Sequence, residues 1–236
     1  MAYPAPKVFT SWSNSRLNLY DQCPYKAKLV NLEKRPEPKN AAMTRGIDIH
    51  ALAEQYLKGV RRLFPPELKL HAPLFKAIRA QVKRDPASVI IEDNWAFTKS
   101  WGPSRWDDWA NCWLRVKLDC AVRDGNVVTI YDFKTGKYRT DNFDEYTRQL
   151  ELYALTALLV FSSIGAELQV SPRLVYLDTG DVYGSEVYNL SDVPKLKKTW
   201  EKRVKPMMND KVFAPKPNRW CPWCYFRKDN GGPCQY

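Results

Sequence analysis

The sequence predicts an α/β protein with a central mixed β-sheet flanked by helices and a short cysteine-rich attachment at the C-terminus. Segments rich in β-branched residues alternate with segments of helical periodicity. The dipeptide Asp124-Gly125, which is typical of tight hairpin turns, lies between two strand-like segments. Three of the six cysteines lie within 213–236, after a proline-rich link. Strands and helices in this mixed order are typical of a sheet with helices packed on its faces.

Each element follows from a local pattern. Serine and asparagine residues ahead of an apolar-periodic run predict a first helix, which Pro24 interrupts or restarts. In the next helix the periodicity makes Ile47, Leu52 and Tyr56 the expected core contacts. Helices are expected at 11–33, 43–58, 71–84, 144–163 and 193–208, and strands at 88–97, on both sides of the turn within 113–136, at 169–177 and at 182–188.

Length and charge limit the function classes without choosing among them. A chain of 236 residues accommodates one sizeable core with a short attachment. The net charge of +11 favours binding to a polyanion such as a phosphate backbone, which suits ribosomal, membrane-surface and nuclease proteins alike. Tryptophans are frequent between positions 95 and 113, where they could stack on bases, although we expect most of them in the core.

The cysteines are expected to be reduced. No apolar stretch is long enough to span a membrane, and the N-terminus lacks the apolar run of a secretory signal. We therefore expect a cytoplasmic protein, bacterial or, if phage-encoded, in the host cytoplasm. Thiols in that compartment are free or bind metals. Cys112 and Cys120 are expected to be small buried side chains on the strand beside Asp119.

Two aspartates are brought together if the predicted hairpin has a two-residue turn. With Asp124 and Gly125 as the central turn residues, Asp119 lies opposite Ile130 and is the diagonal neighbour of Asp132. Diagonal Cα atoms are about 7–8 Å apart, so both carboxylates can reach one cation. The inference depends on this register, because a different turn length would change the pairing.

Paired carboxylates of this kind indicate hydrolytic chemistry. They repel each other unless a proton or metal compensates, and oxygen ligands suit magnesium or manganese. Such a metal activates a water and neutralises charge on a phosphate. Lys134 shares the face of Asp132 and could orient or help deprotonate that water, or stabilise developing charge on the phosphate. From spacing alone, a structural ion pair on a solvated strand face explains these residues equally well.

The order of motifs resembles a known family. The motifs are Tyr20-x-x-Cys23-Pro24-Tyr25, Gly46-x-x-x-His50, Asp119, Asp132-Phe133-Lys134-Thr135-Gly136 and Gln149-x-x-x-Tyr153. Each is unspecific alone, but together and in this order they resemble the RecB-like branch of the PD-(D/E)XK nuclease superfamily. The resemblance implies a restriction-endonuclease-like core, expected at 1–212 with the N-terminal helical segment 10–60 included. The segment 213–236 is then a cysteine-rich metal-binding tail packed with the Cys23 region.

The same resemblance implies a role for each motif residue. Lys134 would be the catalytic lysine, and Gln149 and Tyr153, one helical turn apart, would position a DNA strand or its end. Without the resemblance these two residues would pass as ordinary core-edge residues, and the histidine of the second motif as a packed helix-face side chain. The implied magnesium or manganese ligands are His50, Asp119, Asp132 and the backbone carbonyl of Phe133.

The cysteines carry a second resemblance. Cys221 and Cys224, with Cys234 nine residues later, leave a tetrahedral site one ligand short. AddB-type and CRISPR-adaptation nucleases look similar, and they imply a [4Fe-4S] cluster completed by Cys23. The gap before Cys234 is longer than the spacing associated with that subset. Zinc is the alternative ligand, and free thiols remain a third interpretation.

The expected function is a stand-alone deoxyribonuclease that acts on single-stranded or end-containing duplex DNA, from its ends. The chain has no G-x-x-x-x-G-K-[ST] phosphate loop, so unwinding of a duplex would need a helicase or recombination partner. Recombination, repair, phage DNA processing and CRISPR adaptation are all compatible contexts. The alternatives are a structure-selective endonuclease with the same site and a non-catalytic DNA-binding module with a cysteine-ligated metal.

Overall fold

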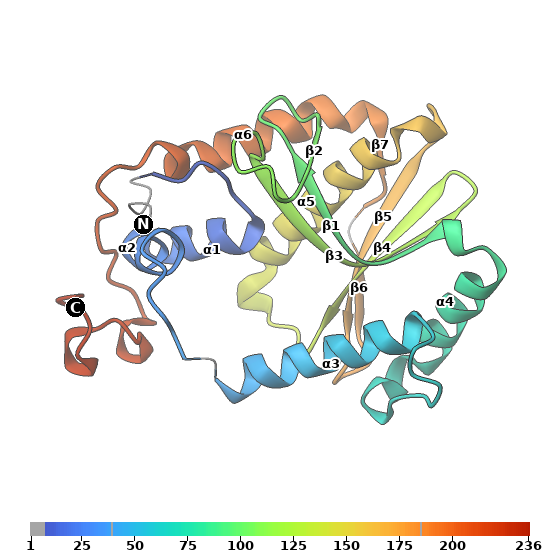
Figure 1. Ribbon diagram of the computed structural model, residues 1–236, viewed down its shortest axis with the longest axis horizontal. Helices are drawn as coiled ribbons and strands as arrows, with labels where there is room; N and C mark the ends of the chain where they lie inside the picture. Colours follow the sequence, from blue (N-terminus) through green and yellow to red (C-terminus); the bar gives the residue numbers. More distant parts are fainter. Residues whose placement is uncertain (1–7, 39, 185) are drawn as a thin grey trace.

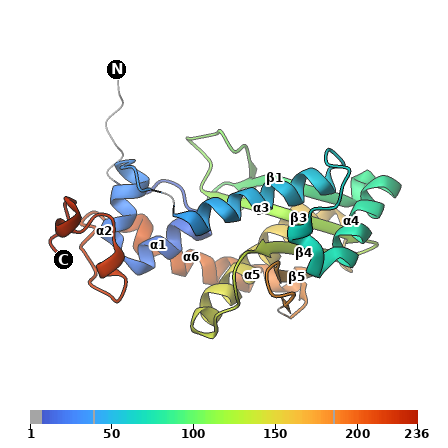
Figure 2. The ribbon, with the colours of Figure 1, turned by 90° about the horizontal axis from the view of Figure 1, so that it is seen from below.

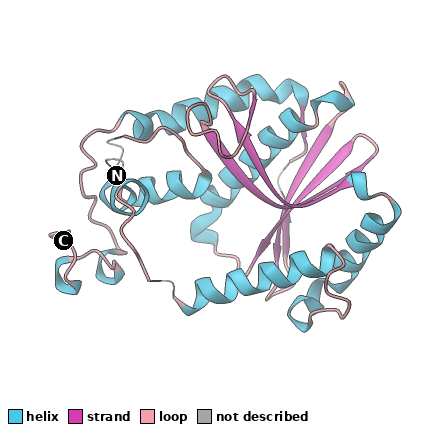
Figure 3. Ribbon diagram, in the orientation of Figure 1, coloured by secondary structure: helices cyan, strands magenta, loops and turns pink. Residues whose placement is uncertain are grey.

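The fold is one mixed β-sheet between two layers of helices. The computed structural model describes residues 8–38, 40–184 and 186–236. In this described part, the strand order is β2-β1-β3-β4-β5-β6, and β7 also pairs with β5. Among the pairs of strands that the structure describes, only β4 with β5 is parallel. Helices α5 and α6 cover one face of the sheet, and α3 and α4 cover the other (Figures 1 and 3). This arrangement confirms the predicted fold class.

The elements agree closely with the predicted ranges. The main helices are α1 (Asn14–Gln22), α2 (Pro24–Ala27), α3 (Ala41–Leu57), α4 (Ala72–Arg84), α5 (Phe143–Val160) and α6 (Val193–Asn209). The strands are β1 (Val89–Phe97), β2 (Pro103–Ser104), β3 (Leu114–Asp124), β4 (Val127–Lys134), β5 (Gln169–Tyr176), β6 (Val182–Gly184) and β7 (Tyr188–Asn189). Among the helices that the structure describes, none has the length and apolar character needed to cross a membrane.

The turn between β3 and β4 differs from the predicted one. Asp124 pairs with Val127, so the central turn residues are Gly125 and Asn126 rather than Asp124 and Gly125. Gly125 has a φ of 59° whereas Asn126 does not have a positive φ, as in a type II′ turn with glycine first. The predicted register was therefore wrong by two residues. Because side chains alternate with a period of two, this error does not itself move any side chain to the other face.

The side-chain alternation of the sheet changes sides in the middle of β1 and β3. On β3, Leu118 packs in the core with α5 and α6, whereas Cys120 packs in the core with α3 and α4. A regular strand would send both side chains to the same face. On β1 the same change separates Ile91 from Trp95, and between them Glu92 has a positive φ of 50°. The irregularity thus affects two neighbouring strands at the same level.

Two local predictions were wrong. Ile47 is 51% exposed, because α3 turns Ile49 and Ala53 toward the sheet instead; Tyr56 is buried as expected. The expected core face was therefore rotated around the helix. Cys112 is buried but lies in the loop just before β3, not on the strand, whereas Cys120 is a buried strand residue as expected.

The C-terminal segment packs against the first helices at one end of the molecule. Lys216 Nζ donates a hydrogen bond to the backbone carbonyl of Asp21 (2.6 Å), and Asn218 Nδ2 donates to that of Gln22 (3.0 Å). Figure 2 shows the C-terminal segment beside α1 and α2. Tail residues that follow the long α6 are thus held against the first helices.

Candidate active site

Asp132 is the most enclosed carboxylate of the site. It lies near the end of β4 with 4% of its surface exposed. Its Oδ1 accepts hydrogen bonds from the Tyr153 hydroxyl (2.7 Å) and from Gln149 Nε2 (3.2 Å), both on α5. Lys134 Nζ lies 2.6 Å from its Oδ2. Apart from this ion pair, the buried Oδ2 has no hydrogen-bond donor among the described residues. It therefore retains capacity for another electropositive partner.

Asp119 lies where β3 and β4 begin to separate. The paired residues end at Cys120 and Tyr131, and continuing the count brings Asp119 level with Asp132 rather than with Ile130. Instead of a carbonyl on the neighbouring strand, the Phe133 backbone N–H donates to Asp119 Oδ2 (2.8 Å). The carboxylate thus takes the place of a ladder hydrogen bond, which fixes its position between the strands.

His50 approaches this carboxylate from the other helical layer. It lies on α3, and its Nδ1 is 3.4 Å from Asp119 Oδ1. Asp132, by contrast, is bonded to residues of α5. The site is therefore assembled through the sheet, from helices on both of its faces.

Glu92 is a member of the site that the sequence did not indicate. It lies opposite Asp119, between the Ile91–Cys120 and Asp93–Leu118 pairs of β1 and β3. Ligand atoms of His50, Glu92 and Asp119 all lie within 4.8 Å of one another. Lys117 Nζ is 3.1 Å from Glu92 Oε2, and Glu92 has a conformation that non-glycine residues rarely adopt in a strand.

The clustered charges shift one another's ionisation. Burial lowers the pKa of His50, but the carboxylate of Asp119, with those of Asp132 and Glu92, outweighs burial and raises it. Burial raises the pKa of Asp132, and Asp119 raises it further against the opposing effect of Lys134. Burial lowers the pKa of Lys134, but the adjacent Asp132 outweighs burial and raises it. The lysine is therefore charged at neutral pH.

A groove runs from this site along the protein. Lys134, Gln149 and Tyr153 line it, and it extends to the first turn of α1 and the start of β3. His50 and Asp119 do not line the groove. The carboxylate site is therefore connected to the groove through the three residues that contact Asp132, which are Lys134, Gln149 and Tyr153. An extended polymer bound along the groove would therefore pass Lys134.

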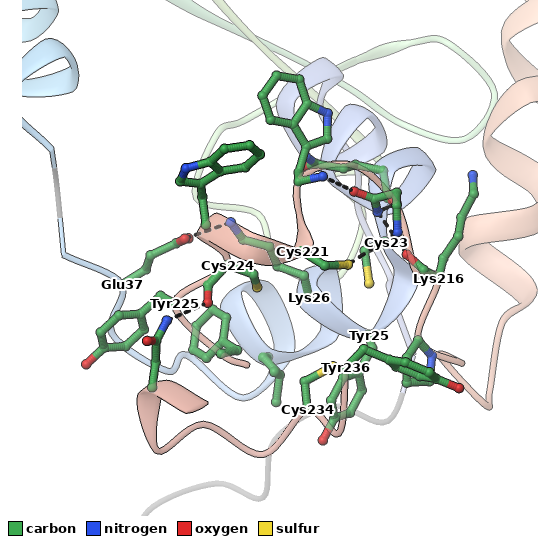
Figure 4. Close-up of a pocket in the computed structure, with 18 of the residues that line it drawn as sticks. Cys23, Tyr25, Lys26, Glu37, Lys216, Cys221, Cys224, Tyr225, Cys234 and Tyr236 are labelled. Carbon is green, nitrogen blue, oxygen red and sulfur yellow. Dashed lines mark hydrogen bonds and ion pairs between the residues drawn. The ribbon is translucent and has the colours of Figure 1, made fainter. Parts of the chain in front are cut away.

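The four cysteines of the second resemblance line one pocket. Cys23 lies between α1 and α2, and Cys221, Cys224 and Cys234 belong to the tail packed beside them (Figure 4). All four are partly exposed free thiols. The Asn218 backbone N–H lies 3.3 Å from Cys221 Sγ, as a donor to that sulfur. Residues distant in sequence thus provide one sulfur-rich site.

Comparisons with known proteins identify the family. A model of the PD-(D/E)XK nuclease superfamily matches residues 11–228. Among solved structures, a candidate exonuclease from Eubacterium rectale is 15% identical, covers 91% of this chain and 87% of its own, and has a TM-score of 0.46. The protein SSO0001 is 13% identical, with 77% of this chain and 95% of that chain covered and a TM-score of 0.34. No curated protein matches the chain.

The family assignment rests on the sequence match, which covers nearly the whole chain and every motif residue from His50 to Tyr153. The site offers an imidazole nitrogen and several carboxylate oxygens, which together suit a divalent cation. The chain belongs to the PD-(D/E)XK nuclease superfamily and is a metal-dependent nuclease that acts on DNA.

Proposed function

We propose that this nuclease is a magnesium- or manganese-dependent deoxyribonuclease of the RecB-like branch that degrades DNA from its ends. The observation that carries the proposal is the convergence of motifs from both faces of the sheet. His50 contributes from α3, Asp119 from β3, Asp132 and Lys134 from β4, and Tyr153 from α5. The resemblance associates the histidine with exonuclease-type members. Recombination, repair or phage DNA processing, with a helicase to unwind duplexes, would suit this activity.

The donor set fits a hard divalent cation. Asp132 Oδ2 is buried and short of donors, and the carboxylates that surround His50 favour any added positive charge. When bound, the ion supplies Lewis acidity at the scissile phosphate and lowers the pKa of a coordinated water. The proposed ligands are His50, Asp119, Asp132, the Phe133 carbonyl and, from the structure, Glu92.

The remaining polar residues hold this site in place. Tyr153 and Gln149 both donate to Asp132 Oδ1, and Gln149 Nε2 also lies 3.1 Å from the Tyr153 hydroxyl. Together they orient the carboxylate, and the Tyr153 hydrogen bond favours its ionised form against the effect of burial, in addition to the DNA-positioning role that the resemblance implies. Lys134 is a cation in the resting protein, so we assign it to stabilising negative charge on the phosphate rather than to removing a proton from water.

The cysteine pocket is proposed to hold a [4Fe-4S] cluster. A single zinc ion, with each sulfur about 2.3 Å away, would hold its sulfurs about 3.8 Å apart. Among the described residues, no three sulfurs of Cys23, Cys221, Cys224 and Cys234 lie within 4.8 Å of one another. A four-iron cluster gives each thiolate its own iron and so accepts a wider arrangement. The segment 213–236 would then be a metal-binding unit attached to the nuclease domain at 1–212.

The decisive test is cleavage of labelled DNA with manganese or magnesium. Single strands and duplexes with free, 5′-blocked or 3′-blocked ends are compared with circular DNA. We expect cleavage of substrates with accessible ends, and its loss in Lys134→Ala and Asp119→Ala while DNA binding persists. Cleavage of circular DNA at the same rate would instead identify an endonuclease. A wild-type protein that binds all substrates and cuts none would refute the enzymatic function.

The cluster is tested separately on anaerobically purified protein. We expect a brown protein with iron and acid-labile sulfide in a ratio near one to one, both lost in Cys224→Ser. A colourless protein with one zinc per chain would refute the cluster and establish the zinc alternative.

A further inference from the structure

Two arginines lie together on the groove that Lys134 lines. Arg16 belongs to α1 and Arg115 to the start of β3. They meet because the chain just before α1 pairs with that strand: the Trp12 N–H donates to the Trp113 carbonyl (2.7 Å) and the Arg115 N–H to the Trp12 carbonyl (2.9 Å). Backbone pairing therefore fixes the first turn of α1 beside Arg115.

The hydrogen-bond partners of the two guanidinium groups are neutral. Arg16 Nη1 and Arg115 Nη1 both donate to Ser11 Oγ, at 2.9 and 2.8 Å. Arg16 Nη1 also donates to the Ser11 carbonyl (3.2 Å), and Arg115 Nε donates to the Trp106 carbonyl (3.1 Å). The Trp109 ring lies 4.5 Å from the Arg115 guanidinium. Within the described residues, no carboxylate forms an ion pair with either arginine.

Arg115 is buried with unused hydrogen-bonding capacity. It is 6% exposed, and its Nη2 is buried without a hydrogen-bond partner in the described part of the chain. A buried, incompletely paired cation is costly, and a second cation sharing the same hydroxyl adds to that cost. Burial and the positive charge of Arg115 both lower the pKa of Arg16. The pair is therefore arranged so that an anion would lower its energy.

The start of α1 adds donors on the same wall of the groove. Ser13 caps this nine-residue helix, and its hydroxyl accepts from the Arg16 backbone N–H (3.3 Å). The backbone N–H groups of Asn14 and Ser15, the first two residues of the helix, have no intrahelical acceptor. The first turn carries no acidic residue. Such a helix terminus favours negative charge.

We propose that Arg16, Arg115 and the first turn of α1 bind a DNA phosphate group at a position along the groove from the scissile bond. The proposal rests on the proposed function for the identity of the ligand as DNA. A guanidinium suits phosphate because its planar donors engage two oxygens at once. A phosphate held here fixes the register of the strand, so that a set bond lies beside Lys134. The group is either a terminal phosphate monoester or an internal phosphodiester.

Binding without metal tests the proposal independently of cleavage. Dissociation constants are measured in EDTA for single strands with a 5′-phosphate, a 3′-phosphate or hydroxyls at both ends, and for circular single-stranded DNA. Arg16→Gln and Arg115→Gln are compared with Lys83→Gln, which removes the same charge from an exposed position on α4 away from the groove. Circular dichroism checks that each variant is folded. Arg16, only half-buried, provides the test if Arg115→Gln does not fold.

We expect Arg16→Gln to weaken binding roughly tenfold or more, as for loss of a charge-assisted hydrogen bond, with little effect of Lys83→Gln. A larger loss for one phosphate-ended strand assigns the site to that terminus. An equal loss on all substrates, circular DNA included, assigns it to an internal phosphodiester. A loss no greater than that of Lys83→Gln overturns the proposal. A protein that lacked nuclease activity would still give a clear result.

Discussion

Tyr153→Phe isolates one hydrogen bond to the central carboxylate. The change keeps the buried ring and removes the hydroxyl that donates to Asp132 Oδ1 at 2.7 Å. Gln149 Nε2, at 3.2 Å, then remains as the donor to that oxygen. A hydrogen bond to a charged acceptor contributes about 1.5–3 kcal/mol. We therefore expect the free energy of unfolding of the metal-free protein to fall by roughly that amount at pH 8, measured by urea denaturation.

The same substitution should slow DNA cleavage. If the whole contribution acts on the transition state, the rate falls about 10- to 100-fold. The Tyr153 hydroxyl also lowers the pKa of Asp132, so its removal raises that pKa further and moves the rising limb of the pH–rate profile to higher pH. A merely structural defect would lower activity without moving the profile.

The control for Tyr153→Phe is Tyr56→Phe. Tyr56 is a buried tyrosine of α3 that packs in the other core, and its hydroxyl bonds to no carboxylate among the described residues. It should leave both the stability and the pH profile nearly unchanged. If Tyr153→Phe changes the free energy of unfolding by less than about 0.5 kcal/mol and the two pH profiles coincide, the inferred role of the hydroxyl is wrong.

Three further predictions concern the metal sites. Glu92→Gln should weaken manganese affinity about tenfold or more in isothermal titration, whereas Asp93→Asn, at the exposed neighbouring position, should not. Equal manganese affinities of Glu92→Gln and the wild type would exclude Glu92 as a ligand. The pKa of His50 is raised, so protons compete with the metal for this imidazole at any pH below that pKa. Manganese affinity should therefore fall by up to about tenfold per pH unit as the pH decreases. His50→Gln should flatten this pH dependence, and an unchanged slope would contradict a role for His50 as a ligand. Cys23→Ser should abolish metal binding in the cysteine pocket and lower the midpoint of thermal unfolding, whereas Cys112→Ala should keep the metal. Iron or zinc retained in Cys23→Ser would exclude the Cys23 thiol as a ligand.

The sequence was sufficient for the fold class because the periodicities of its segments are strong. The register of the hairpin was less well determined, since Asp124-Gly125 and Gly125-Asn126 both satisfy the turn rules. Only the packing of both faces decides between them. The face of α3 was mispredicted for a similar reason: Ile47 and Ile49 are equally apolar, and their neighbours in space are set by distant strands.

Glu92 shows what local patterns cannot predict. An acidic residue in a strand is normally assigned to the solvent face, and its neighbours Ile91 and Asp93 give no sign of a left-handed backbone. The conformation becomes understandable only when Asp119 and His50 are in place, because they surround the carboxylate. Cooperation between elements, rather than propensity, creates this part of the site.

The contact between the C-terminal segment and the first helices has a consequence for biosynthesis. Cys23 emerges from the ribosome about 200 residues before Cys221, Cys224 and Cys234. Because domains fold progressively during synthesis, the sheet and its helices can form while the sulfur-lined pocket is still incomplete. A metal bound by all four thiols, as proposed, would therefore be loaded only after Cys234 has emerged, onto a nuclease core that is already formed.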